Sequence, residues 1–175
     1  MTGPGGRALL AENIHPGAAG ILAGAGFEVE RLAHALGPEE LIERIGDVDL
    51  LGVRSATVVS AEALAAGRRL LAVGAFCIGT NQVDLDDAGR RGIAVFNAPF
   101  SNTRSVVELA VGEIVALTRG LTDKNRAMHS GIWAKSAAGS HEVRGRHLGI
   151  VGYGNIGTCA QQLGRPWQKE SIQMT

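Results

Sequence analysis

The chain has 175 residues, enough for one domain or for one domain and part of another. Lys and Arg together number 17, as do Asp and Glu, so no overall basic field would attract nucleic acid. No apolar run approaches the roughly 20 residues of a membrane span, and the first residues do not read as a signal peptide. We therefore expect a cytoplasmic protein that binds neither nucleic acid nor membranes, with Cys77 and Cys159 as free thiols and no metal site.

Short apolar segments alternate with helix signals over the first hundred residues. Pro16 suits a first helical position, Ser60 and Asp84 suit helix caps, and Gly92 suits a helix stop. The predicted strands are 7–11, 27–32, 48–53, 70–73 and 93–96, and the predicted helices are 16–25, 38–46, 61–66 and 84–91. This alternation predicts an α/β fold with parallel strands and helices on both faces of the sheet. Ligands of such sheets bind beyond the carboxyl ends of the strands.

The segment from Ser101 to about residue 128 predicts one long helix, capped by Ser101 or Asn102. Its apolar residues cover most of the helix surface, so we expect burial on several sides, between two domains or subunits. Residues 131–145 read as a loop, and we expect Trp133 to anchor it.

Residues 147–157 predict a short strand at 148–151 that turns through three glycines into a helix. Gly152 permits a tight turn, Gly154 lets the backbone approach a pyrophosphate, and Gly157 lets the helix pack close to the strand. The first turn of the helix offers unpaired N–H groups to the phosphates. This is the G-x-G-x-x-G pattern of a dinucleotide-binding unit.

Four segments together resemble the D-isomer-specific 2-hydroxyacid dehydrogenase family. They are 52–57 (Gly-Val-Arg-Ser-Ala-Thr), 73–84, 95–108 and 152–157, in the order and spacing of the family. The resemblance runs from about residue 9 to 158 and is strongest to members that oxidise 3-phosphoglycerate to 3-phosphohydroxypyruvate with NAD, in serine synthesis. It implies a flavodoxin-like substrate domain (7–100), the beginning of a Rossmann NAD-binding domain (101–165) and an atypical tail (166–175).

The resemblance also implies site residues. Arg54 and Ser55 match a segment that holds the substrate anion, although some relatives carry a second Arg at the position of Ala56. The other implied substrate contacts are Gly74 and Ala75, placed in the loop after the fourth strand, and Asn102. The implied cofactor contacts are Thr103, Val106, Gly152, Gly154, Asn155, Ile156 and Gly157. For Asn102, Thr103 and Val106, a helix cap and core packing remain an equal alternative. The segment 102–147 corresponds to the family's subunit contact, so a homo-oligomer is implied.

The family's catalytic His, Glu and Arg lie beyond the glycine pattern, and no candidate for them is found in this chain. Its five histidines are scattered, and Ser55, Ser101 and Cys77 have no local base partner. After Thr158 the resemblance fails, Pro166 blocks a helix, and Glu170 is a poor match for the ribose-binding acid. We expect a truncated or frameshifted chain that has no dehydrogenase activity and binds NAD weakly or not at all. Two alternatives stay open: a dehydrogenase of another D-2-hydroxy acid, and a non-catalytic fragment that pairs with a full-length subunit.

Overall fold

The computed structural model describes residues 5–164 and the backbone of residues 173–174. The chain divides into two compact units, Met1–Ser101 (unit 1) and Asn102–Thr175 (unit 2). Within the described residues, no helix is long and apolar enough to cross a membrane.

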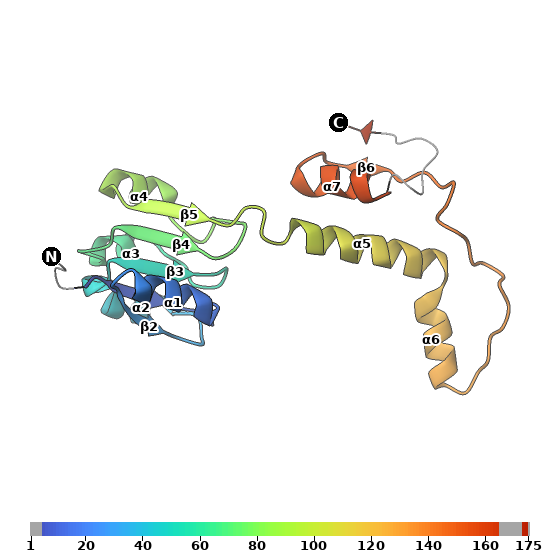
Figure 1. Cartoon of the computed structure of the whole chain (residues 1–175), viewed down its shortest axis with the longest axis horizontal. Coiled ribbons are helices and arrows are strands. Elements are labelled where there is room, and N and C mark those ends of the chain that lie inside the picture. The colour runs from blue at the N-terminus through green and yellow to red at the C-terminus, as the bar shows by residue number, and fades with distance from the viewer. Residues whose placement is uncertain (1–4, 165–172, 175) are drawn as a thin grey trace. The chain divides into compact units, whose positions relative to one another are not determined.

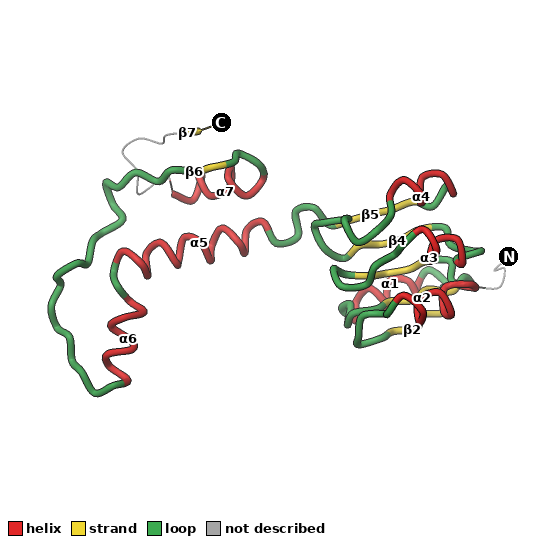
Figure 2. The backbone as a smooth tube through the Cα atoms, turned by 180° about the vertical axis from the view of Figure 1, so that it is seen from behind, coloured by secondary structure: helices red, strands yellow, loops and turns green. Residues whose placement is uncertain are grey.

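Unit 1 is a five-stranded parallel sheet with helices between its strands (Figures 1 and 2). The strands lie in the order β2-β1-β3-β4-β5, the order of a flavodoxin-like sheet. In chain order the elements are β1 (Arg7–Leu10), α1 (Pro16–Gly24), β2 (Glu28–Arg31), α2 (Pro38–Arg44), the short 3-10 helix η1 (Ile45–Asp47), β3 (Leu50–Val53), α3 (Ala61–Ala66), β4 (Ala72–Ala75), α4 (Leu85–Arg91) and β5 (Ala94–Asn97). The predicted α/β class is confirmed.

Local capping chemistry sets the helix ends of unit 1. Asp84 caps α4, where its carboxylate accepts a hydrogen bond from the Asp87 N–H at 2.9 Å. Ser60 caps α3 in the same way, and Gly92 ends α4 in the left-handed conformation at φ +73°. These three predicted boundaries are confirmed.

The core of unit 1 packs one face of the sheet against α2, α3 and α4. Strand residues Leu9, Leu51 and Val73 meet helix residues Leu41 and Leu64 there, and all five are almost fully buried. The strand bounds differ from the predictions by one or two residues, and β4 begins at residue 72 and not at 70. Leu70 is buried in the turn before the strand, so its apolar signal comes from core packing.

A network of ion pairs occupies the edge of the sheet where the strands begin. Arg7, the first residue of β1, pairs with Glu30 at 2.8 Å and with Asp47 at 2.5 Å. Arg44 shares Glu30 at 2.8 Å, and the buried Asp49 accepts hydrogen bonds from Arg69 and from the Arg7 N–H.

Unit 2 contains α5 (Thr103–Thr118), α6 (Leu121–His129), β6 (Ile150–Val151), α7 (Asn155–Gly164) and β7 (Gln173–Met174). Helices α5 and α7 pack against each other, and β6 pairs in parallel with β7 (Figure 1). A strand, a glycine turn and a helix therefore follow one another as the sequence predicts, although β6 is shorter than residues 148–151.

Two expectations for unit 2 are wrong. The single long helix is two helices, because Gly120 adopts a left-handed φ of +59° between them. Among the described residues of α5 only Val107 is buried, and burial of this helix between two domains or subunits stays a prediction. Trp133 is 73% exposed and does not anchor its loop, which is held by hydrogen bonds from Lys124 to Ser136 and Ser140. Pro166 and Glu170 lie outside the described residues.

Candidate functional site

The loop of residues 54–57 follows β3 at the edge of the sheet where the strands end. Parallel strands bring their carboxyl ends to one edge, so the residues after β1, β3, β4 and β5 gather there. The Gln82 side chain donates to the Arg54 carbonyl at 2.6 Å, and the Asn97 side chain donates to the Ile78 carbonyl at 2.8 Å. These bonds tie the loops after β3 and β4 to each other and to the last residue of β5.

Glu12, just after β1, holds the 54–57 loop from the other side. Its carboxylate accepts hydrogen bonds from the N–H groups of Arg54 at 2.9 Å, Ala56 at 3.0 Å and Thr57 at 2.9 Å. Partial burial raises the pKa of Glu12, but the hydrogen bonds from Thr57, Ala56 and Arg54 outweigh burial and hold it below its ordinary value of 4.5. Glu12 is therefore a carboxylate at neutral pH.

The Arg54 side chain lines a cavity of about 420 Å³ in unit 1. The other lining residues are Asn13, Ile14, His15, Pro16 and Phe76. No acidic side chain among the described residues pairs with the guanidinium, whereas Arg7, Arg44 and Arg69 all have carboxylate partners. A guanidinium in an open cavity can form a two-pronged hydrogen bond with a carboxylate or a phosphate.

Gly74 and Ala75 lie within β4 and not in the loop after it. Ala75 pairs with Val53 and Gly74 with Gly52 in the register of the sheet, and the loop begins at Phe76. The expectation that both belong to the loop is wrong, because the strand starts two residues later than predicted. The register still places Ala75 beside the end of β3, next to Arg54.

The three glycines of the dinucleotide pattern each have a distinct geometry in unit 2. Gly152 has a φ of +91°, which side chains rarely adopt. A Cβ on Gly157 would lie 2.4 Å from the Gly152 carbonyl oxygen, so only glycine lets α7 pack this close to the turn. A Cβ on Gly154 would meet no atom within 4 Å, which leaves open space beside the backbone. At the start of α7, the N–H groups of Asn155 and Ile156 precede the first helical hydrogen bond, which the Thr158 N–H donates to the Gly154 carbonyl at 3.0 Å. This geometry fits a pyrophosphate.

The remaining predicted contacts lie at the start of α5. Asn102 is its N-cap residue but makes no side-chain cap, and Thr103 is the first helical residue. Val106 is 38% exposed, while its neighbour Val107 is fully buried. Packing in the core, the alternative to a cofactor contact, therefore fits Val107 better than Val106. Arg54 and Asn102 belong to different units.

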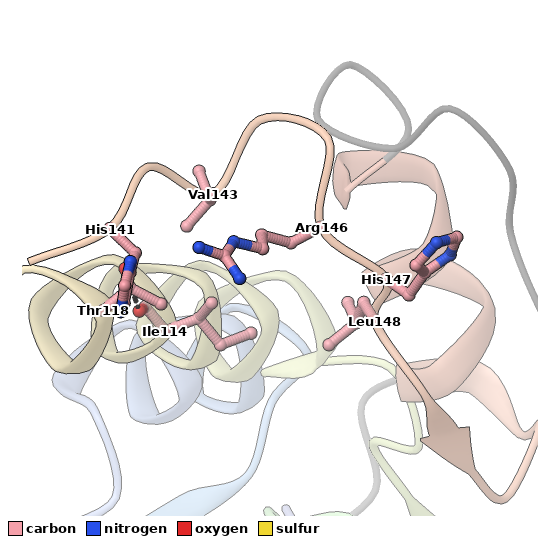
Figure 3. A pocket seen from close by; sticks show the side chains of 7 residues that line it. All are labelled: Ile114, Thr118, His141, Val143, Arg146, His147 and Leu148. Carbon is pink, nitrogen blue, oxygen red and sulfur yellow. Dashed lines mark hydrogen bonds between the residues drawn. The ribbon is translucent and has the colours of Figure 1, made fainter.

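A second pocket, of about 280 Å³, lies in unit 2 beside α5 (Figure 3). It is lined by Ile114, Thr118, His141, Val143, Arg146, His147 and Leu148. The Arg146 side chain extends between Val143 and Ile114, and the His147 ring points away from it (Figure 3). None of the lining residues is acidic, so the pocket offers no histidine and carboxylate pair for proton transfer.

Sequence reasoning missed Glu12 and Gln82. Glu12 is 42 to 45 residues away from the N–H groups that it binds, so no local pattern reveals the contact. A usable signal exists nevertheless, since Glu12 directly follows a predicted strand end, where ligand-facing residues gather. Gln82 lies in the 73–84 segment that the resemblance covers, but no role was expected of it.

The comparisons with known proteins agree with this fold. A family model described as D-isomer specific 2-hydroxyacid dehydrogenase, catalytic domain, matches residues 8–163. Among solved structures, a protein from Thermus thermophilus superposes with a TM-score of 0.85 at 24% identity, over 95% of this chain and 55% of that one. A D-lactate dehydrogenase from Aquifex aeolicus, complexed with NAD and lactic acid, has a TM-score of 0.78 at 19% identity, over 95% and 50% of the two chains.

Curated relatives are much closer in sequence. The D-3-phosphoglycerate dehydrogenase of Haemophilus influenzae is 54% identical over 161 residues, which is 89% of this chain and 39% of the relative. The protein of the same name from Escherichia coli K12 is 52% identical over 157 residues, 89% of this chain and 38% of the relative. The chain thus spans about two fifths of the length of these relatives. With a family model matched over most of its length, the chain belongs to the D-isomer specific 2-hydroxyacid dehydrogenase family.

Proposed function

We propose that the chain carries the substrate-anion site and part of the cofactor site of an NAD-dependent dehydrogenase that oxidises 3-phosphoglycerate to 3-phosphohydroxypyruvate, in serine biosynthesis. The observation that carries the choice of substrate is the 52–54% identity with relatives named for that reaction. In this proposal residues 7–100 form the substrate domain, residues 101–165 begin the NAD-binding domain, and residues 166–175 are an atypical tail.

The substrate's anionic groups bind to Arg54 and Ser55, helped by Gly74, Ala75 and Asn102. The position of Arg54 supports this, because its guanidinium lines a cavity and pairs with no carboxylate among the described residues. A charge-assisted hydrogen bond to such an arginine contributes about 1.5–3 kcal/mol.

The cofactor binds to the glycine turn and to the start of α5. Gly152, Gly154, Asn155, Ile156 and Gly157 hold the pyrophosphate, while Thr103 and Val106 lie toward the nicotinamide. NAD supplies the hydride acceptor. The open space at Gly154 and the close approach of Gly157 to Gly152 support this assignment.

The reaction also needs a general base, which the family supplies as a histidine paired with a glutamate, beside a catalytic arginine. Among residues 5–164, the one histidine and carboxylate pair is His34 with Glu40, at 3.3 Å, and the His34 side chain is exposed. His15 instead caps α1 by accepting the Gly17 N–H. We therefore propose that this polypeptide on its own binds substrate without oxidising it.

The test is calorimetric titration of the purified 175-residue chain with 3-phosphoglycerate. Arg54→Ala should weaken binding by roughly 10-fold to 100-fold, the loss of one charge-assisted contact. Arg68→Ala, an exposed arginine of the same unit, is the matched control and should bind like the parent chain. Equal binding by both variants would contradict the substrate site, and NADH formation by the chain would contradict the assignment of catalysis.

A different D-2-hydroxy acid is the second candidate. Ala56, exposed in the substrate loop, stands where some relatives carry another arginine, so the phosphate has one cation fewer. Titration with D-lactate in place of 3-phosphoglycerate separates the two. Tighter binding of lactate would favour this candidate.

Unit 2 is proposed to pair with another subunit through residues 102–147. Its exposed apolar side chains include Leu109, Leu117 and Trp133, which are 65%, 76% and 73% exposed. This surface also suits a non-catalytic fragment that pairs with a full-length subunit. Size-exclusion chromatography with light scattering should give a dimeric mass, and a monomer at micromolar concentration would contradict the pairing.

A further inference from the structure

The 54–57 loop forms a small anion-binding nest, and a side chain of the chain itself already fills it. Three of its four N–H groups, from Arg54, Ala56 and Thr57, point to the two carboxylate oxygens of Glu12 at 2.9–3.0 Å. Converging backbone N–H groups of this kind are a common site for phosphates and carboxylates. The Ser55 N–H differs, since it donates to no acceptor among the described residues.

The backbone of Glu12 is held in place for this contact. Glu12 and Asn13 adopt left-handed φ angles of +59° and +52°, and they are the two described non-glycine residues that do so. Such a conformation is costly and persists where the surroundings enforce it. Here the Glu12 N–H donates to the His34 carbonyl and the Asn13 N–H donates to the Leu32 carbonyl, both at 2.9 Å.

The opposite side of the loop is fixed as well. The Arg54 carbonyl accepts from the Gln82 amide at 2.6 Å, and the fully buried Thr57 accepts the Leu36 N–H through its hydroxyl at 3.1 Å. The groups of the loop left for a ligand are therefore the Arg54 guanidinium and the N–H and hydroxyl of Ser55.

We propose that Glu12 is a positioning residue that acts as a built-in anion: it occupies the backbone nest, excludes the substrate's anion from it, and directs that anion to Arg54 and Ser55. This rests on the proposed function, because it concerns the same anion site. An anion in the nest would lie against Arg54, Ala56 and Thr57, and with Glu12 present that position is filled by a charge of the same sign.

The experiment is a titration of the ¹⁵N-labelled chain followed by amide NMR. Three anions serve as probes: 3-phosphoglycerate, inorganic phosphate and formate. Glu12→Gly empties the nest and suits the left-handed backbone, whereas Glu12→Gln keeps the side-chain volume and removes the charge. Glu28→Gln, at an exposed glutamate of β2, is the matched control.

In the parent chain, 3-phosphoglycerate should shift the Arg54 Nε–H and the Ser55 amide and leave the Arg54, Ala56 and Thr57 amides unmoved. In Glu12→Gly, formate and phosphate should shift those three amides, with binding about tenfold tighter than to the parent, or about 1.4 kcal/mol. Glu12→Gln keeps the nest filled, so formate should leave the Arg54, Ala56 and Thr57 amides of this variant unmoved. The Glu28→Gln control should behave like the parent.

The failures are distinguishable. If 3-phosphoglycerate shifts no signal in the parent chain, the proposed function fails, and the formate titration of Glu12→Gly still decides the role of Glu12. If the three nest amides move with 3-phosphoglycerate in the parent, or stay unmoved with formate in Glu12→Gly, the role of Glu12 is refuted. If Glu12→Gly does not fold, the other two chains decide: nest amides that move with 3-phosphoglycerate in the parent, or with formate in Glu12→Gln, refute the role of Glu12.

Discussion

Thr57→Val should destabilise unit 1 although it puts an apolar side chain of the same shape into a buried position. Thr57 is fully buried, and its hydroxyl accepts the N–H of Leu36, itself 4% exposed, at 3.1 Å. Valine leaves this N–H without an acceptor and without access to water. An unsatisfied buried donor costs about 1–3 kcal/mol.

The expected change in the free energy of unfolding is therefore about 2 kcal/mol, or roughly 10 °C in Tm for a unit of this size. Thr57→Ser is the matched control, because it keeps the hydroxyl and loses only a methyl group, at a cost of about 1 kcal/mol. The free energy of unfolding should therefore be higher for Thr57→Ser than for Thr57→Val.

The assay must report on unit 1 alone. Both tryptophans, Trp133 and Trp167, follow Ser101 in the sequence, so tryptophan fluorescence would not report on the sheet. Amide hydrogen exchange of core residues in β1 and β3 gives the local free energy of opening. If Thr57→Val exchanges as slowly as the parent, or more slowly than Thr57→Ser, the reasoning about the buried N–H is refuted.

Three further predictions concern single positions. The folded-state pKa of Glu12 lies below 4.5, so its stabilising contribution is present above pH 4.5 and is lost as the pH falls through the folded-state pKa. Glu12→Gln should therefore reduce the loss of stability on acidification below about pH 5, measured by urea unfolding. An unchanged dependence of the unfolding free energy on pH would contradict this. Gly157→Ala should destabilise unit 2 by about 1–3 kcal/mol through overpacking, whereas Gly154→Ala should leave its stability unchanged, as thermal unfolding of both variants can check; the reverse order would contradict the geometry. Gly120→Ala should lower the stability of unit 2 by about 1 kcal/mol because of the left-handed φ at this position, while Gly112→Ala inside α5 should raise it by about 0.5–1 kcal/mol. Thermal unfolding followed by circular dichroism tests both variants, and equal effects would refute the prediction.

Features with a local cause were predictable from the sequence. Asp84 caps α4 because a carboxylate satisfies an N–H three residues along, and sequence spacing encodes that contact directly. The same holds for the turn at Gly152, where a positive φ calls for glycine. The alternation of strands and helices likewise predicted the parallel sheet, since short crossovers leave few other topologies.

Features that depend on distant or missing neighbours were not predictable. Glu12 meets the 54–57 loop only after β1 and β3 have paired. Trp133 was expected to anchor its loop because it is the large apolar residue there, yet it is 73% exposed. Gly120 was missed because one glycine within a long apolar pattern does not reveal its φ angle. The strand shift at Leu70 has a similar origin, since burial in a turn imitates the apolar signal of a strand.

The ion-pair network at the starting edge of the sheet gives the two edges different tolerances to mutation. At that edge Arg7 and Arg44 share Glu30, so a substitution there disturbs several partners and is felt as a change in folding. At the other edge Arg54 has no acidic partner among the described residues, and a substitution at the neighbouring Ala56 changes an exposed side chain. If the proposed anion site is right, substitutions on the outer face of this loop should change anion binding more than folding, whereas substitutions in the ion-pair network should change folding more than binding.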